Sequence, residues 1–148
     1  MWDVHVMGAV YATQAVLPGM IARGFGRVVN VASTAGLRGY PYATAYCAAK
    51  HALVGLTRAL AAETAARGVT VNAVCPGYTD TDLVRDSISR VAAKTGRAQA
   101  EVLAEYERDA PIGRLIRPEE VAAAVLYLCS PEAAAVTGTT LAIAGGEM

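Results

Sequence analysis

The chain lacks an excess of charge of either sign. Its 148 residues include 13 basic and 13 acidic side chains, so the formal net charge is zero. A chain without net charge exerts no long-range attraction on nucleic acid or on an anionic membrane surface. The composition therefore predicts no nucleic-acid partner and no binding to a membrane surface.

Cysteine is also scarce. The three cysteines are odd in number and widely separated, at Cys47, Cys75 and Cys129, and no Cys-x-x-Cys pair occurs. This pattern favours ordinary thiols in a reducing compartment, and it predicts neither a disulfide framework nor a metal site. We expect Cys47 to pack against a neighbour rather than to react.

Charged residues are absent from one long segment. Residues 4–22 contain no Lys, Arg, Asp or Glu and are long enough to imitate a membrane span. No basic segment precedes the run as in a secretory signal. Five residues inside it argue against insertion: His5, Gly8, Thr13, Gln14 and Pro18. We interpret the run as a buried amphipathic helix and expect a soluble, cytoplasmic protein.

The apolar residues that are present predict an α/β fold. They make up 54% of the chain, which is ample for a core, and the length favours a single domain over residues 1–148. Apolar runs predict strands near 28–33, 69–74 and 139–144. Helical periodicity predicts helices over 4–21, 42–66 and 118–130, with two more between 80 and 109 that are separated by Gly96. The alternation of helices and strands implies a parallel sheet.

Three side chains in this pattern could act on a carbonyl group. Tyr46 and Lys50 are four residues apart, so they share one face of the expected helix. A cation near a phenol stabilises the phenolate, which a proton-transfer catalyst needs. Ser33 ends a predicted strand, where open α/β sheets place ligands. The alternative is that Ser33 only caps a strand and that Lys50 is solvated.

Four ordered segments extend this pattern over most of the chain. They are Gly26-Arg27-Val28-Val29-Asn30-Val31-Ala32-Ser33, Tyr46-Cys47-Ala48-Ala49-Lys50, Asn72-Ala73-Val74-Cys75-Pro76-Gly77 and Arg117-Pro118-Glu119-Glu120-Val121-Ala122, followed by Thr137-Gly138 and Gly145-Gly146. Together they resemble the short-chain dehydrogenase/reductase family. The resemblance implies part of a Rossmann-like, doubly wound parallel sheet. It also implies an NAD- or NADP-dependent oxidoreductase acting on a small-molecule secondary alcohol or ketone, with a 3-hydroxyacid or its thioester as one candidate.

The resemblance also implies roles for individual residues. Tyr46 would be the general acid/base, Lys50 would assist it and hold the nicotinamide ribose, and Ser33 would steady the substrate oxygen. Pro76 and Gly77 would place the backbone beside the nicotinamide ring.

Thr79 and His5 depart from the family pattern, and both of them, as well as Thr81, have a second interpretation. Thr79 and Thr81 would contact the carboxamide of the cofactor, although the family usually has Val or Ile at position 79; helix N-capping is the alternative. His5 stands where the family usually has an asparagine that holds a water in a proton relay. An imidazole can bridge a water too, and it titrates near neutral pH. The alternative for His5 is a histidine packed between helices.

Members of the resembled family begin with a strand and a glycine-rich turn that binds the cofactor pyrophosphate. Neither Gly24-Phe25-Gly26 nor Gly145-Gly146 precedes a helix that could serve this purpose. The chain therefore resembles the C-terminal catalytic part of such an enzyme. We expect a truncated gene model, a fragment, or a piece that needs a complementary chain. The second hypothesis for function is a non-catalytic remnant that associates with full-length homologues.

The family also suggests a substrate lid and an oligomer. Members build a lid where this chain has residues 83–116, and they commonly form dimers or tetramers through helices that are present here. Six apolar residues of the segment could line a pocket or form the inward stripe of two helices; they are Leu83, Val84, Ile88, Val91, Leu103 and Tyr106.

Overall fold

The computed structural model describes residues 1–147, and its elements follow the order predicted above. The strands are β1 (Gly26–Val31), β2 (Val69–Pro76) and β3 (Thr140–Ile143). The long helices are α1 (Gly8–Arg23), α2 (Thr44–Thr64), α3 (Asp82–Thr95), α4 (Gln99–Asp109) and α5 (Pro118–Cys129). Short helical turns complete the list: η1 (Asp3–Met7), η2 (Thr34–Gly36), η3 (Ala65–Arg67) and η4 (Pro131–Ala133).

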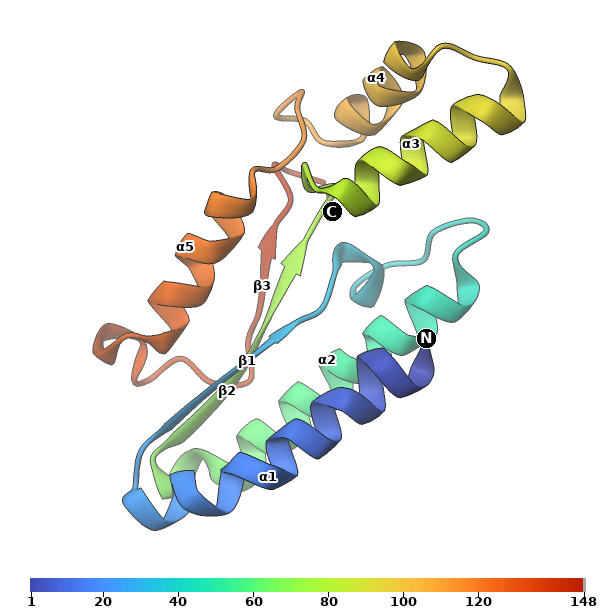
Figure 1. The fold of residues 1–148 in the computed structure, drawn as a ribbon. Coiled ribbons are helices and arrows are strands. Elements are labelled where there is room, and N and C mark those ends of the chain that lie inside the picture. Colours follow the sequence, from blue (N-terminus) through green and yellow to red (C-terminus); the bar gives the residue numbers. More distant parts are fainter. Residues whose placement is uncertain (148) are drawn as a thin grey trace.

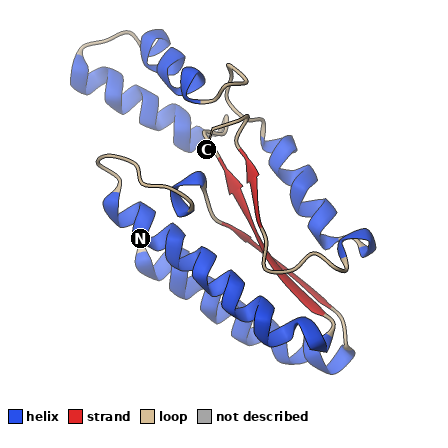
Figure 2. Ribbon diagram, turned by 180° about the vertical axis from the view of Figure 1, so that it is seen from behind, coloured by secondary structure: helices blue, strands red, loops and turns tan. Residues whose placement is uncertain are grey.

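The helices cover both faces of the sheet. Figure 1 shows α1 and α2 side by side on one face, α5 on the other, and α3 with α4 beyond the carboxyl ends of the strands. Figure 2 shows the same layers from behind. This arrangement confirms the predicted α/β class.

The sheet of the described residues is parallel, with strand order β1-β2-β3. Gly26 of β1 pairs with Val69 of β2, and Ala73 of β2 pairs with Thr140 of β3. The three strands end at one edge of the sheet. That edge holds Ser33 and the Pro76–Gly77 turn, as the ligand-binding edge of an α/β sheet requires.

The central strand β2 is buried along nearly its whole length, because helices cover it on both faces. One core cluster lies between the sheet and α2, and a second brings α1 into the same layer. The first contains Ala32, Leu53, Val54, Ala73 and Cys75, and the second contains Ala61, Val69 and Val71 with Leu17, Met20 and Ile21 packed against them.

A buried amide connects β2 to the segment before β3. Asn72 is fully buried, its Nδ2 donates to the Val136 carbonyl at 2.8 Å, and its Oδ1 accepts from the Thr139 amide at 3.1 Å. A buried side chain that meets its hydrogen-bonding needs in this way fixes one local arrangement. The asparagine of the Asn-x-x-x-Pro-Gly segment therefore has a structural role here.

The expectation of a buried first helix is wrong for the described residues. The helical stretch from Asp3 to Arg23 is long and apolar enough to cross a membrane by length and composition, yet only 11% of its most apolar window is buried. Val6 and Thr13 are the residues buried in it, whereas Val4 and Tyr11 are exposed. The reason is geometric, because the helix packs against α2 and β1 through one side and its other side has no neighbour among residues 1–147.

The helices of the 83–116 segment bury their apolar residues against each other. Ile88 and Ala92 of α3 form a cluster with Val102 of α4, and four further side chains pack on it: Val84, Val91, Leu103 and Tyr106. Leu83 is exposed. The inward-stripe interpretation is therefore confirmed for Val84, Ile88, Val91 and Leu103, and it is wrong for Leu83. Tyr106 packs on this cluster, and its ring also lies 4.4 Å from that of Tyr78.

Candidate active site

Lys50 is a buried cation in the middle of the candidate site. Only 6% of Lys50 is exposed, and its Nζ donates to the Val31 carbonyl at the end of β1, at 2.9 Å. Burial lowers the pKa of the Lys50 ammonium, while the Cys75 thiol opposes this shift. Lysine is rarely buried without a purpose, since removing a charge from water is costly. The solvated lysine of the alternative interpretation is therefore wrong.

Tyr46 lies between Lys50 and His5. The Lys50 Nζ is 5.6 Å from the centre of the Tyr46 ring, which confirms that the two side chains share one face of α2. The His5 ring meets the Tyr46 ring edge-on, with 5.8 Å between ring centres and 84° between the planes. Three of the predicted residues therefore lie in one cluster, although they come from two separate helical elements.

His5 belongs to a turn with unusual geometry. It lies in η1, a π-helical turn that runs into α1, and such turns are frequent at functional sites. Burial lowers the pKa of His5, and the nearby positive charges of Lys50 and of the chain's amino terminus lower it further. The imidazole is therefore held toward its neutral form, in which one ring nitrogen can accept a hydrogen bond. Its part in a proton relay stays a prediction.

Ser33 follows β1 directly and precedes the η2 turn. Its Oγ accepts a hydrogen bond from the Ala35 amide at 3.1 Å, so the side chain caps that turn. The turn is pressed onto α2 at Gly36, where an added Cβ would lie 2.8 Å from the Lys50 carbonyl oxygen. The segment that carries Ser33 therefore packs on the same turn of α2 that carries Lys50.

The predicted cofactor-side residues form a continuous turn after β2. Pro76 ends the strand, and the Gly77 amide donates to the Ile143 carbonyl at 3.1 Å. The Thr79 hydroxyl donates to the Gly77 carbonyl at 3.0 Å, and the Thr81 hydroxyl donates to the Thr79 carbonyl at 3.3 Å. Thr81 precedes α3 but makes no capping hydrogen bond with its side chain, so the N-capping alternative is wrong for Thr81.

A group of polar side chains whose mutual contacts were not predicted from the sequence borders this turn. Glu147 is 2% exposed, and its Oε1 accepts hydrogen bonds from the Tyr40 hydroxyl and from the Arg38 guanidinium. Burial raises the pKa of Tyr40, and the hydrogen bond to Glu147 raises it further. No local spacing signals this group, because Tyr40 and Glu147 are 107 positions apart.

The residues present fit the nicotinamide end of a dinucleotide. An anchored ammonium on Lys50, the neighbouring Tyr46 phenol and the side-chain-free backbone at Gly77 lie at the ligand-binding edge of the sheet. In the described part of the chain, no glycine-rich turn leads into a helix that would bind the pyrophosphate. The fit therefore concerns the nicotinamide and its ribose.

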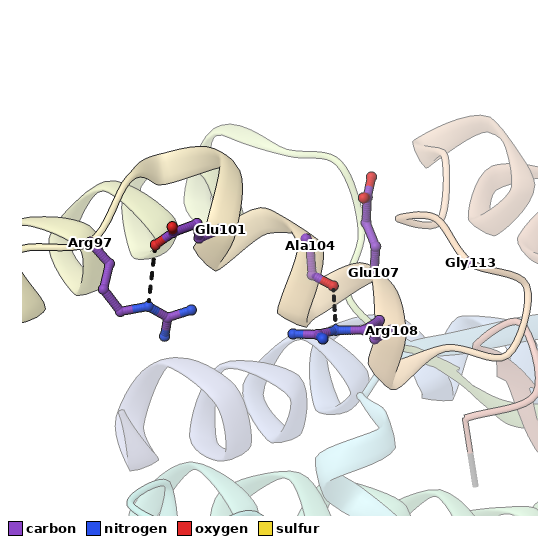
Figure 3. Close-up of a pocket in the computed structure, with 6 residues that line it drawn as sticks. All are labelled: Arg97, Glu101, Ala104, Glu107, Arg108 and Gly113. Carbon is purple, nitrogen blue, oxygen red and sulfur yellow. Dashed lines mark hydrogen bonds and ion pairs between the residues drawn. The ribbon is translucent and has the colours of Figure 1, made fainter.

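A hollow of about 470 Å³ lies elsewhere, on the surface of α4. Figure 3 shows its lining, in which Arg97 faces Glu101 and the Arg108 guanidinium lies over the Ala104 carbonyl. Arg97 also forms two hydrogen bonds to Glu105, at 3.0 and 2.6 Å. None of the candidate catalytic residues lines this hollow, and Arg97 and Glu101 of its lining form an ion pair.

Comparison with known sequences shows which proteins the chain is similar to. The family described as Enoyl-(Acyl carrier protein) reductase matches residues 1–147. The chain is 46% identical to 2-(S)-hydroxypropyl-CoM dehydrogenase 3 of Xanthobacter autotrophicus, covering 98% of the chain and 56% of that protein. It is 41% identical to an acetoacetyl-CoA reductase of Rhizobium meliloti, covering 97% and 55%. A third relative, 45% identical over 97% of the chain and 60% of its own length, is named inactive 2-(S)-hydroxypropyl-CoM dehydrogenase 2.

Solved structures also include relatives that are similar to nearly the whole chain and longer than it. A variant of the actinorhodin polyketide ketoreductase, solved with NADPH, is 41% identical with a TM-score of 0.91, covering 97% of the chain and 56% of that protein. A short chain dehydrogenase family protein from Francisella tularensis is 30% identical with a TM-score of 0.92, covering 99% and 60%. The chain thus spans a little over half the length of the relatives it matches.

Proposed function

Because the chain belongs to the short-chain dehydrogenase/reductase family, we propose that residues 1–148 form a single domain, the catalytic part of an NAD- or NADP-dependent enzyme. Its reaction is the interconversion of a secondary alcohol and a ketone. The observation that carries this proposal is the buried Lys50, anchored to the end of β1 and adjacent to the ring of Tyr46.

In the reducing direction, the chain's residues manage the proton and the carbonyl oxygen. A nicotinamide held at its ribose by Lys50 would supply the hydride for the carbonyl carbon. Tyr46 donates its hydroxyl proton to the substrate oxygen, and the Ser33 hydroxyl hydrogen-bonds to the same oxygen. The Lys50 ammonium stabilises the phenolate that Tyr46 becomes, since opposite charges attract strongly in a buried site.

His5 is proposed to pass a proton between the site and solvent. Its ring meets that of Tyr46 edge-on, and burial lowers its pKa, so that a neutral imidazole is available to accept a proton. A His5→Asn variant would then have a pH–rate profile of altered shape in the range where the imidazole titrates. An unchanged profile would leave His5 as a packing residue.

The cofactor and the substrate are proposed from the relatives. One solved relative contains NADPH, and other relatives are an acetoacetyl-CoA reductase and a hydroxypropyl-CoM dehydrogenase. These names favour a ketone, or its alcohol, carried on a thioester or thioether of a larger carrier. Pro76 and Gly77 would place the backbone beside the nicotinamide ring, and Thr79 and Thr81 would contact its carboxamide. We also propose a homodimer or homotetramer in the cytoplasm.

The alternative is a non-catalytic remnant that associates with a full-length homologue. It gains weight from the relative named inactive. Titration of the purified chain with NADH and NADPH, followed by assays with acetoacetyl-CoA and smaller 3-oxoesters, separates the two. Saturable cofactor binding with turnover supports the enzyme. Absence of both, with co-purification of an intact homologue, supports the remnant.

A further inference from the structure

A buried carboxylate joins segments that border the candidate site from different parts of the chain. Glu147 follows β3, and its Oε1 accepts a hydrogen bond from Arg38 at 2.6 Å and another from the Tyr40 hydroxyl. The Arg38 guanidinium also lies over the Tyr40 ring, 4.6 Å from its centre. Charge-assisted hydrogen bonds of this kind are about twice as strong as neutral ones.

Tyr40 is fixed at both of its ends. Its hydroxyl is hydrogen-bonded to Thr34 Oγ1 at 2.7 Å, and its amide donates to Cys47 Sγ at 3.4 Å. Thr34 is the residue after Ser33, and Cys47 is the residue after Tyr46. The position of Tyr40 is therefore linked to both expected catalytic side chains through the residues next to them.

The second oxygen of Glu147 faces the expected cofactor side. Its Oε2 is buried and has no hydrogen-bond partner among the described residues. It lies against Gly77, where an added Cβ would be 2.6 Å away. Burying a carboxylate oxygen without a donor costs free energy, so an apolar residue would serve packing better at this position. Packing alone does not account for a glutamate here.

We propose that Glu147 is a positioning residue for the substrate. Through Tyr40 and Arg38 it holds the loop after Ser33 against the Pro76–Gly77 turn, and this sets the width of the substrate side of the site. The inference rests on the proposed function and adds to it a determinant of substrate selection.

Three tyrosine rings form a row from the Glu147 group toward α4, and we call this row the aromatic wall. The Tyr78 ring lies 6.5 Å from that of Tyr40, and the Tyr106 ring of α4 lies 4.4 Å from that of Tyr78. Glu147 therefore anchors one end of a row of three rings, and the other end belongs to the segment where the family builds its lid. Such a row suits the acyl part of an extended ketone, because rings offer large contact area at little entropic cost.

Two variants and their combination test the proposal in the protein at the length its gene encodes. Tyr40→Phe removes the hydroxyl and keeps the ring, and Glu147→Gln removes the charge and keeps the shape. With acetoacetyl-CoA and saturating cofactor, each variant is expected to raise KM about tenfold, with kcat within about twofold of wild type. The cofactor KM is expected to stay unchanged in Tyr40→Phe, because the Tyr40 hydroxyl is bonded to Thr34 and Glu147 and not to the Pro76–Gly77 turn. Because the two residues act as one unit, the double variant is expected to be no worse than the worse single variant.

The matched controls carry the same chemical changes at residues outside the Glu147 group and the aromatic wall. Tyr42→Phe alters a fully exposed tyrosine two residues further along the chain, and Glu119→Gln alters an exposed glutamate at the start of α5. Both are expected to keep the wild-type KM.

Three outcomes would contradict the positioning role, and a fourth would contradict the proposed function. An unchanged KM in Tyr40→Phe, a fall in kcat without a rise in KM, or effects that multiply in the double variant would overturn the positioning role. If Glu147→Gln fails to fold, Tyr40→Phe alone decides, since its ring is retained. Wild-type protein without any turnover would instead overturn the proposed function, and this inference with it.

Discussion

At the scale of single residues, the site contains two ionisable side chains, Lys50 and His5, whose charged forms are disfavoured by burial. Lys50 is buried beside Tyr46. Burial and the positive charge of Lys50 lower the pKa of His5, which favours its neutral form. Each of these groups pays a desolvation cost in the folded state. Because the pKa of each group differs between the folded and unfolded states, its titration changes the free energy of unfolding with pH.

His5 gives a prediction about acid pH. Its pKa in the folded state lies below the ordinary 6.5 of the unfolded chain. Between these two values the unfolded chain binds more protons, so stability rises with pH through that window and falls on acidification. Wild-type protein is expected to lose more stability between pH 7.5 and pH 5.5 than His5→Asn does, as measured by urea unfolding. Equal losses in the two proteins would show that the imidazole is not held in its neutral form.

At the scale of elements, close packing between η2 and α2 holds the Ser33 segment in place. A Cβ at Gly36 would lie 2.8 Å from the Lys50 carbonyl oxygen and 3.2 Å from Val54 Cγ2. The carbonyl belongs to helix backbone, which cannot move aside as a flexible side chain can. The approach of the two elements therefore requires glycine at this position.

Gly36→Ala is accordingly expected to lower the free energy of unfolding by about 1–3 kcal/mol, the usual cost of forcing an extra methyl into a packed contact. The control is Gly39→Ala on the same loop, because an added Cβ there meets nothing within 4 Å. Denaturant unfolding of both variants measures the difference. A loss of similar size in the two variants would show that the loop, and not its contact with α2, is sensitive.

The elements themselves could largely be predicted from the sequence. Local periodicity gives the three strands and the long helices, and glycine stops such as Gly24 and Gly68 end α1 and η3 where expected. The shared face of Tyr46 and Lys50 also follows from spacing alone. The exposure of α1 did not follow, because burial depends on which elements pack nearby and not on the apolar content of the helix. The Glu147 group was missed for a related reason: its members meet only after the chain has folded.

At the scale of the whole molecule, the sheet of residues 1–147 has an open edge at β1. The strand pairs with β2 on one side only, and Val31 is 54% exposed. The Ala32 amide donates to Val74, so amides alternate between the β2 side and the open side along the strand. Unpaired edges of this kind are templates for another strand.

Hydrogen exchange on the polypeptide of residues 1–148 tests this description. Amides that face β2 are expected to be protected, and those that face the open side are expected to exchange far faster, since they lack a partner. The first set is Val28, Asn30 and Ala32, and the second is Arg27, Val29 and Val31. Equal protection of both sets would mean that another strand, from a second copy or elsewhere, pairs with β1.

The most direct test of the central claim is the single-turnover rate of ketone reduction by Tyr46→Phe, in the protein at the length its gene encodes. Tyr42→Phe serves as the control, because Tyr42 is fully exposed and precedes α2 on the same stretch of chain. Loss of the proton donor predicts a rate about 10²- to 10⁴-fold lower for Tyr46→Phe, with a wild-type rate for the control. A Tyr46→Phe rate that is within about threefold of the wild-type rate would contradict the role of this phenol in the reaction.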